Sequence, residues 1–169
     1  MKKRVGILTS GGDCPGLNAT IRGVAKALYA RMGDNVEIVG ILNGYSGLIN
    51  GDYKEMSEDD FRGILTLGGT ILGTKRTPFK MMRVVEDDNV DKVAAMKKTY
   101  KDAKLDCLLC LGGNGTHKTS RIQLHAGLLR GLRSYAGSRR QGSRRFRQGG
   151  GRVPCGVSIC TAKNSACSP

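Results

Sequence analysis

The sequence contains no tryptophan, only three phenylalanines and four prolines among its 169 residues, and no long apolar run. A membrane-spanning helix needs about 20 consecutive apolar residues, so the sequence excludes one. The first residues, 1–8, begin with basic side chains but lack the apolar stretch of a signal peptide. Hydrophobic residues make up 39% of the chain, which permits a core and argues against wholesale disorder. We therefore expect a cytoplasmic protein without membrane contacts.

Acidic residues are absent beyond Asp106. Residues 1–120 hold 18 Lys and Arg against 14 Asp and Glu, whereas residues 121–169 hold 10 Lys and Arg and no acid. The basic residues also change, from 12 Lys and 6 Arg to 1 Lys and 9 Arg, the latter among 8 Gly and 6 Ser. The composition predicts a folded part in residues 1–120 and a disordered, Arg/Gly/Ser-rich tail in residues 121–169.

The tail has two interpretations. Its bias toward Arg, Gly, Ser and Cys without acids resembles coding DNA translated in a wrong frame, so our hypothesis is a frameshift just after Ser120. The alternative is an Arg/Gly-rich segment that binds nucleic acid, with a steep dependence on salt. The tail offers only Tyr135 and Phe146 as stacking aromatics, so any such binding is expected to be nonspecific.

Apolar periodicity organises the start of the chain. Residues 4–8 and 36–42 are short runs of β-forming residues, and between them apolar residues recur at helical spacing from Leu17 to Leu28. A helix there would stop at Gly33. Strand, glycine-rich turn, helix and strand make a βαβ unit, whose strands are parallel.

The same patterns continue to residue 120. Ser57 begins a capping box before a short helix. Asn89 is predicted to cap a helix that ends near Lys104. Residues 105–111 form a further apolar strand, and a helix is expected to start near His117 or Lys118. The predicted fold class is α/β, with a mostly parallel sheet and helices on both faces.

Three glycine-rich loops, residues 11–18, 67–78 and 112–119, lie at or near the carboxyl ends of predicted strands. Ligands bind at that edge of an open α/β sheet. Glycine lets backbone N–H groups approach an anion closely, and a helix N-terminus adds a favourable dipole. The second loop also carries Lys75 and Arg76. The three loops predict a cradle for several phosphates, although each alone could be a turn that needs a positive φ.

The common phosphate motifs, G-x-x-x-x-G-K-[ST] and G-x-G-x-x-G, are absent, so neither a P-loop nucleotide triphosphatase nor a Rossmann dehydrogenase is supported. Instead, four segments resemble the 6-phosphofructokinase family in order and spacing. They are Gly-Gly-Asp-Cys-Pro-Gly-Leu-Asn at 11–18, Gly-Tyr-Ser-Gly-Leu at 44–48, Gly-Thr-Ile-Leu-Gly-Thr-Lys-Arg at 69–76 and Gly-Gly-Asn-Gly-Thr-His-Lys-Thr at 112–119. The resemblance covers residues 1 to about 120, the first third of a typical family member.

The resemblance implies an ATP-dependent kinase of glycolysis that transfers the γ-phosphoryl group of MgATP to the 1-hydroxyl of fructose 6-phosphate, and that assembles as a homotetramer. It assigns catalytic roles to the Gly12 backbone and to the Arg76 guanidinium, and both would also contact ATP. The other implied ATP-binding residues are Tyr45, Thr77, Gly113, Asn114, Gly115 and Thr116.

Two positions in the third loop distinguish members of the family. Gly115 resembles the ATP-using members, whereas an Asp there suggests the use of pyrophosphate. Asn114 stands where many members have an aspartate that helps to hold Mg²⁺, and an amide oxygen is a weaker ligand for that cation. Arg22 lies in a neighbourhood that family members use for an allosteric effector, although a surface ion pair is the simpler interpretation.

The P-x-T-I-D-N-D segment that carries the family's general base has no counterpart, and neither does the sugar-phosphate lobe. Loss of a general base costs about 10²–10⁴ in rate, so we expect this chain to be inactive alone. Two alternatives remain: another kinase with a Gly-Gly-x-Gly-Thr loop, such as the NAD or diacylglycerol kinases, or a non-catalytic nucleotide- or nucleic-acid-binding module.

Cys107 and Cys110 form C-x-x-C within a predicted strand. At this spacing the two side chains point to opposite faces of the strand, which favours packing in the core over binding of a metal ion.

Overall fold

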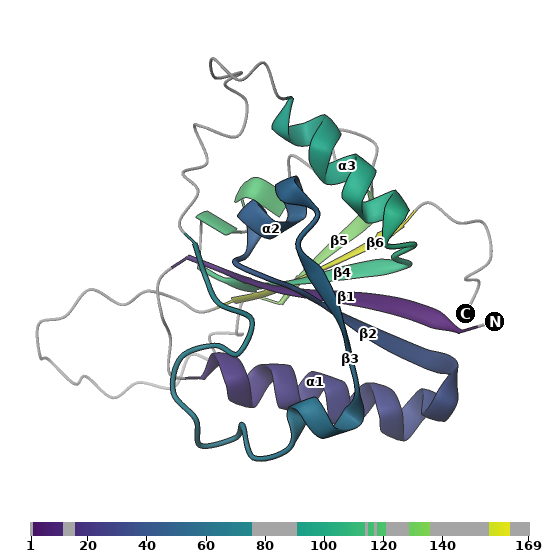
Figure 1. Ribbon diagram of the computed structural model, residues 1–169, viewed down its shortest axis with the longest axis vertical. Coiled ribbons are helices and arrows are strands. Elements are labelled where there is room, and N and C mark those ends of the chain that lie inside the picture. The colour runs from purple at the N-terminus through teal and green to yellow at the C-terminus, as the bar shows by residue number, and fades with distance from the viewer. Residues whose placement is uncertain are drawn as a thin grey trace, which may run out of the picture.

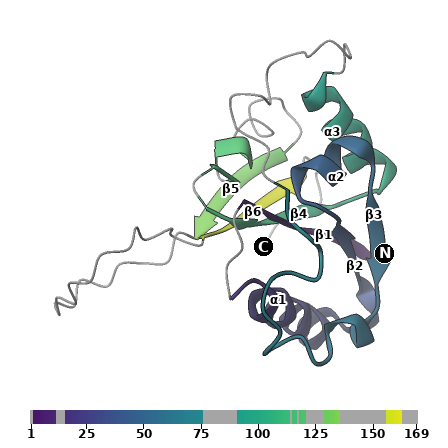
Figure 2. The same ribbon diagram turned by 60° about the vertical axis from the view of Figure 1, so that its left-hand side comes forward.

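A six-stranded sheet forms the centre of the molecule, with the strand order β3-β2-β1-β4-β6-β5. The computed structural model describes residues 2–11, 16–75, 91–113, 115–116 and 118–120 and, as backbone alone, residues 129–135 and 156–162. Helix α1 covers one face of the sheet, and α2 and α3 lie together on the other (Figures 1 and 2). Because helices cover both faces, the predicted α/β class is confirmed.

The described strands are β1 (Lys3–Ser10), β2 (Val36–Ile41), β3 (Tyr53–Met56), β4 (Cys107–Gly112), β5 (Leu129–Tyr135) and β6 (Gly156–Ala162). The helices are α1 (Leu17–Met32), α2 (Tyr45–Asn50) and α3 (Lys92–Asp102), with short 3₁₀ turns η1 (Gly33–Asn35) and η2 (Glu58–Phe61). The predicted strand–helix–strand unit at the start of the chain is confirmed, and α1 ends at Gly33 as expected. The short elements α2 and β3 were not predicted.

The sheet is mixed. Strand β1 pairs in parallel with both β2 and β4, which makes the three central strands parallel as predicted. Outside this centre, β3 runs antiparallel to β2, and β6 runs antiparallel to β4 and β5. The expectation of a mostly parallel sheet therefore holds for the centre and not for the two sides.

Strands β5 and β6 lie within the tail that we expected to be disordered, so these two segments differ from that expectation. Strand β6 pairs with β4 from Cys107 to Gly112. An uncovered β4 would present unpaired N–H and C=O groups along its edge, and β6 satisfies them. The division between residues 1–120 and 121–169 stays a prediction.

The core has one layer on each face of the sheet. Alternate residues of β4 show the division, because Leu108 and Cys110 pack with α2 and α3, whereas Leu109 and Leu111 pack with α1. Cys107 packs against the α1 layer. The two cysteines of the C-x-x-C pair thus face opposite sides of the sheet, as predicted.

The structure shows the capping residues at the starts of η2 and α3, for which the sequence predicted Ser57 and Asn89. The Ser57 capping box is confirmed, with Asp60 Oδ2 accepting hydrogen bonds from the Ser57 backbone N at 2.8 Å and from its Oγ at 3.0 Å. These bonds lower the pKa of the Asp60 carboxyl below its usual value. The cap of α3 is Asp91, whose carboxylate accepts from the N–H groups of Val93 and Ala94. The prediction of Asn89 was wrong as to the capping residue, and Asn89 lies outside the described residues.

No helix in the described part of the chain is long and apolar enough to cross a membrane.

Candidate functional site

Segments from three loops meet where β1 ends. We call this region the rim, and it consists of residues 9–11, 43–45, 70–75, 112–113 and 115–116. Because β1, β2 and β4 are parallel, their carboxyl ends lie at the same edge of the sheet. That edge is where α/β sheets bind ligands.

The third glycine loop is fixed to β1 through Thr116. Its Oγ1 donates a hydrogen bond to the backbone oxygen of Ser10 at 2.9 Å, and both residues are buried. The hydroxyl of Tyr45, at the start of α2, donates to the backbone oxygen of Thr116 at 2.8 Å. Thr116 therefore joins the end of β1 to α2 and holds the residues that follow β4 in place.

The second glycine loop is fixed to the same strand end. Thr74 Oγ1 donates to the backbone oxygen of Gly11 at 2.8 Å. Two residues before Thr74, the backbone oxygen of Leu72 accepts a hydrogen bond from the backbone N of Asn43, also at 2.8 Å. The described part of the loop ends at Lys75, a rim residue that is exposed. Described residues of all three loops that the sequence predicted as a phosphate cradle thus lie at one edge, with Gly11, Thr74 and Thr116 among them.

Two rim glycines allow this close approach. Gly44 has a φ of 66°, and a Cβ there would lie 2.6 Å from the backbone oxygen of Thr9. A Cβ at Gly112 would overlap the backbone oxygen of Ser10 and the hydroxyl of Thr116. A larger residue at either place would push the loops apart.

The rim offers groups that suit an anion. Its side-chain and backbone groups are hydroxyls, amides and one lysine, and the described rim residues include no carboxylate. Gly115 is exposed, and a side chain there would meet no described atom within 4 Å. In the described part of the chain, no group of three or more His, Cys, Asp or Glu side chains could hold a metal ion. The described residues therefore fit phosphate oxygens and do not by themselves form a site for Mg²⁺.

Comparison with known proteins agrees with this geometry. The model of the family described as Phosphofructokinase matches residues 4–129. The chain belongs to the phosphofructokinase family. It is 56% identical over 126 residues to the ATP-dependent 6-phosphofructokinase of Spirochaeta thermophila, a match that covers 73% of this chain and 34% of the relative.

Two further relatives show the breadth of the family. The pyrophosphate–fructose 6-phosphate 1-phosphotransferase of Amycolatopsis methanolica is 44% identical over 114 residues, which cover 67% of this chain and 30% of the relative. The crystal structure of Pichia pastoris phosphofructokinase in the T-state superposes with a TM-score of 0.62 at 31% identity, over 75% of this chain and 13% of that chain. The chain spans about a third of the length of the curated relatives it matches.

Half of the site residues implied by the resemblance lie within the described chain. Gly113, Gly115 and Thr116 all belong to the rim. Tyr45 also reaches it, but its side chain is only 1% exposed, so its ring lies in the core and its hydroxyl contacts Thr116. The other four lie outside the described residues: Gly12, Arg76, Thr77 and Asn114.

Sequence reasoning missed two buried polar side chains that bind the second loop, Thr9 at the rim and Asn18 in the first turn of α1. Thr9 lies in a strand, where threonine is an ordinary β-former. Asn18 lies in the first turn of α1, where asparagine is common near a cap. The sequence offered one indication of these residues: each is a polar residue at a position that the apolar pattern of its element predicts to be buried.

A hollow of about 160 Å³ lies between α1 and η2, away from the rim, and is lined by Arg22, Ala25, Lys26, Tyr29, Glu58, Phe61 and Arg62. Arg22 Nη1 donates to the backbone oxygen of Phe61 at 2.6 Å, so its described partner is a carbonyl and the expected surface ion pair was wrong. Burial, with the charges of Glu58 and Asp60, raises the pKa of Tyr29. An effector role for Arg22 stays a prediction.

Proposed function

We propose that this chain supplies nucleotide-phosphate binding for an ATP-dependent 6-phosphofructokinase, which transfers a phosphoryl group to the 1-hydroxyl of fructose 6-phosphate. One observation carries the proposal. The second and third glycine-rich loops are fixed to the end of β1 and to Gly11, where the first loop begins, through Thr116 to Ser10, Thr74 to Gly11 and Thr9 to Gly73.

The chemistry suits such an arrangement. Phosphoryl transfer depends mainly on positioning and on stabilising the charge that spreads over the phosphate oxygens. In the proposed complex, backbone N–H groups of Gly113 and Gly115 contact nucleotide phosphates. Lys75 and the following Arg76 supply positive charge, and the Arg76 guanidinium suits two phosphate oxygens at once. The Gly12 backbone, Thr77 and Asn114 complete the proposed site.

Gly115 supports ATP over pyrophosphate as the donor. The position is exposed and has open space, so a nucleotide phosphate can approach the backbone there. An aspartate would fill that space with negative charge. Mg²⁺ would supply further neutralisation of the phosphates, and in the proposal it is held mostly by their oxygens, since the described rim has no carboxylate.

The complete reaction needs groups beyond those of the rim. No Asp or Glu follows Asp106, so the later part of this chain offers no carboxylate to take the proton from the sugar hydroxyl. We therefore propose that the chain alone binds nucleotide and does not turn over. Fructose 6-phosphate binding, homotetramer assembly and a place in glycolysis belong to the proposal through the family.

The test is titration calorimetry of the full chain with ATP, using Gly115→Asp as the variant. We expect wild type to bind ATP and the variant to bind at least tenfold more weakly, about 1.4 kcal/mol, because the added carboxylate repels the phosphates. Gly115 is the first helical residue that the structure describes after β4, and a negative charge early in a helix is favourable, so the melting temperature should not fall.

Gly23→Asp is the matched control. Gly23 is an exposed residue of α1, and its side chain would likewise meet no described atom within 4 Å. It should leave ATP affinity unchanged. Absence of ATP binding in the wild type, or equal loss in the two variants, would contradict the proposal. Binding of RNA with steep salt dependence and no nucleotide heat would instead favour the basic module.

A further inference from the structure

We propose that Thr9 and Asn18 are positioning residues that hold the second glycine loop in its nucleotide-binding place. This inference rests on the proposed function, because the loop ends in Lys75 and Arg76. Both side chains are fully buried, and they come from β1 and α1, the two elements that flank the first glycine loop. Thr9 precedes the first glycine-rich segment and Asn18 is its last residue, and the resemblance assigns neither of them a contact with ATP.

The second loop depends on bonds from outside itself. The stretch from residue 62 to residue 75, which includes the described part of this loop, contains no helix or strand, only turns, bends and irregular backbone. Within this stretch, the backbone bonds are those from Leu67 N to Ile64 O and from Gly73 N to Thr70 O, both 3.2 Å long. Because so few hydrogen bonds form within the loop, its position depends on hydrogen bonds from neighbouring elements.

Asn18 binds this loop with both ends of its amide. Its Nδ2 donates to the backbone oxygens of Leu67 at 3.0 Å and Gly68 at 3.3 Å, and its Oδ1 accepts from the backbone N of Ile71 at 2.8 Å. An asparagine this early in a helix commonly caps its own helix. Here the side chain instead joins the start of α1 to a loop about 50 residues away.

Thr9 completes a chain of hydrogen bonds whose direction can be assigned. Its Oγ1 donates to the backbone oxygen of Gly73 at 2.8 Å, which uses its only hydroxyl proton. The 2.9 Å bond between Thr9 Oγ1 and Thr70 Oγ1 must therefore be donated by Thr70. Thr70 Oγ1 in turn accepts from the backbone N of Leu72 at 3.2 Å. Every polar atom of this relay is used.

The relay fixes the residues that lead into the site. Thr9 holds Gly73, and the next residue, Thr74, holds the backbone oxygen of Gly11. Lys75 and Arg76 follow directly. Removing the Thr9 hydroxyl leaves the Gly73 oxygen and the Thr70 proton without their partners, so the loop is free to move relative to β1. If the loop is no longer held in place before ATP binds, ATP affinity falls even though no group that contacts ATP has changed.

The experiment compares Thr9→Val with Thr99→Val in the full chain. Both threonines are buried, but Thr99 lies in α3 on the opposite face from α1. Two quantities are measured: amide hydrogen exchange of residues 71–73 without nucleotide, and ATP affinity. We expect Thr9→Val to raise both the exchange rate and the ATP Kd about tenfold, and Thr99→Val to change neither. Thr9→Ser, which keeps the hydroxyl, should restore both.

Thr70→Val is the second variant. Thr70 is only partly buried, so this substitution removes the relay from the loop side with less risk to folding. It should reproduce the Thr9→Val result. Unchanged exchange at residues 71–73 in both variants, or equal changes in Thr99→Val, would overturn the positioning role. If wild type does not bind ATP, the proposed function fails, while the exchange rates still decide whether Thr9 positions the loop.

Discussion

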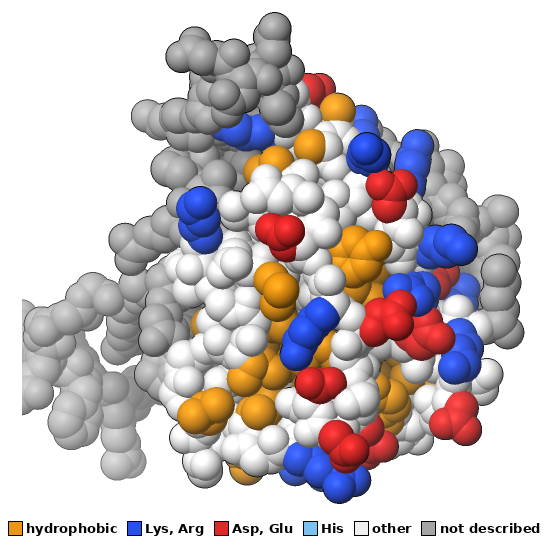
Figure 3. All heavy atoms as spheres, in the orientation of Figure 1, with side chains coloured by type: hydrophobic (Ala, Val, Ile, Leu, Met, Phe, Trp, Pro, Cys, Tyr) orange, Lys and Arg blue, Asp and Glu red, His pale blue; other side chains and the backbone are white. Residues whose placement is uncertain are grey.

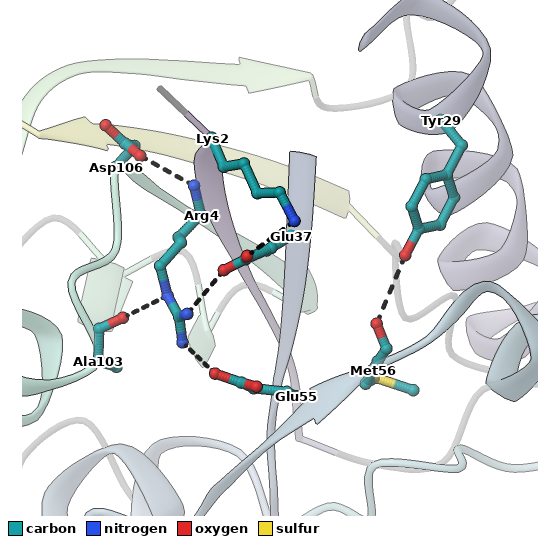
Figure 4. Close-up of polar contacts among 8 residues, drawn as sticks. All are labelled: Lys2, Arg4, Tyr29, Glu37, Glu55, Met56, Ala103 and Asp106. Atoms are coloured by element: carbon teal, nitrogen blue, oxygen red, sulfur yellow. Dashed lines mark hydrogen bonds and ion pairs between the residues drawn. The ribbon is translucent and has the colours of Figure 1, made fainter. Parts of the chain in front are cut away.

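The two ends of the central sheet are built from different chemistry. At the carboxyl ends of the strands, the rim is joined by hydroxyls and backbone groups. At the opposite end lies a charged group that we call the amino-end cluster, which consists of Lys2, Lys3, Arg4, Glu37, Glu55 and Asp106. Figure 4 shows all of these residues except Lys3. Charged side chains gather toward the right of Figure 3, the side on which the N-terminus lies in Figure 1.

Arg4 is the centre of the amino-end cluster. Its guanidinium donates to Glu37 at 2.7 Å, to Glu55 at 2.8 Å and to the backbone oxygen of Ala103 at 2.9 Å. Its backbone N donates to Asp106 at 2.8 Å. One side chain thus joins β1, β2, β3 and the turn after α3. The hydrogen bond and charge of Glu55, with the charge of Glu37, raise the pKa of Arg4.

The charged side chains of the amino-end cluster pair with one another and stabilise the fold, whereas the exposed cation of the rim remains for a ligand. Among the described residues, the ion pairs lie in the amino-end cluster or around η2, and none involves a rim residue. Charge at the amino end is neutralised within the protein. At the rim, the polar groups hold the loops together, and the exposed Lys75 faces no carboxylate of the rim itself. Stability and binding should therefore respond to different substitutions.

Arg4→Ala is expected to have the largest effect on stability. The side chain is 21% exposed, and its loss leaves two carboxylates close together without their shared cation. We expect the free energy of unfolding to fall by about 2 kcal/mol, less than for a fully buried ion pair because solvent screens the group. Urea denaturation measures the loss, and ATP titration should show an unchanged Kd.

Arg62→Ala is the control for this substitution. Arg62 pairs with Asp59 at 3.1 Å, but both side chains are exposed. Such pairs contribute about 0–1 kcal/mol, so the control should lose less than Arg4→Ala. A large loss of ATP affinity in Arg4→Ala at a temperature where the protein remains folded would break the separation between the two ends.

A smaller effect is expected at the capping box of η2. Ser57→Ala removes a cap and should cost about 0.5–1 kcal/mol. The pKa of Asp60 is lowered in the folded state, so its contribution is present above the unfolded pKa and is lost as the pH falls through the folded value. In Asp60→Asn, the acid-dependent loss of stability should shrink. Thermal melts between pH 3 and pH 7 measure this, and an unchanged pH profile would show that Asp60 contributes nothing.

Much of the fold could be predicted because its main elements are long and regular. The apolar spacing from Leu17 to Leu28 gives α1, and the β-forming runs give β1, β2 and β4. Elements α2 and β3 have only six and four residues, too few for a period to be visible. Pairing of β6 with β4 joins residues about 50 apart and depends on an open sheet edge rather than on local sequence.

The candidate site was predictable only in part. Glycine motifs identified the loops, since close backbone approach limits the residue type at Gly44 and Gly112. They did not identify the bonds between loops. Thr9 and Asn18 act across distances of about 50 to 65 residues, and their partners are backbone atoms of any residue type. The buried position of Tyr45 likewise depends on the packing of α2 against the sheet.

The central claim is that the rim, and not the amino-end cluster, binds a triphosphate. Amide hydrogen exchange of the full chain with and without ATP tests it most directly. The account predicts slower exchange at Gly11, Lys75, Gly113 and Gly115, with no change at Arg4. Protection at the amino-end cluster, or no protection at the rim under saturating ATP, would contradict it.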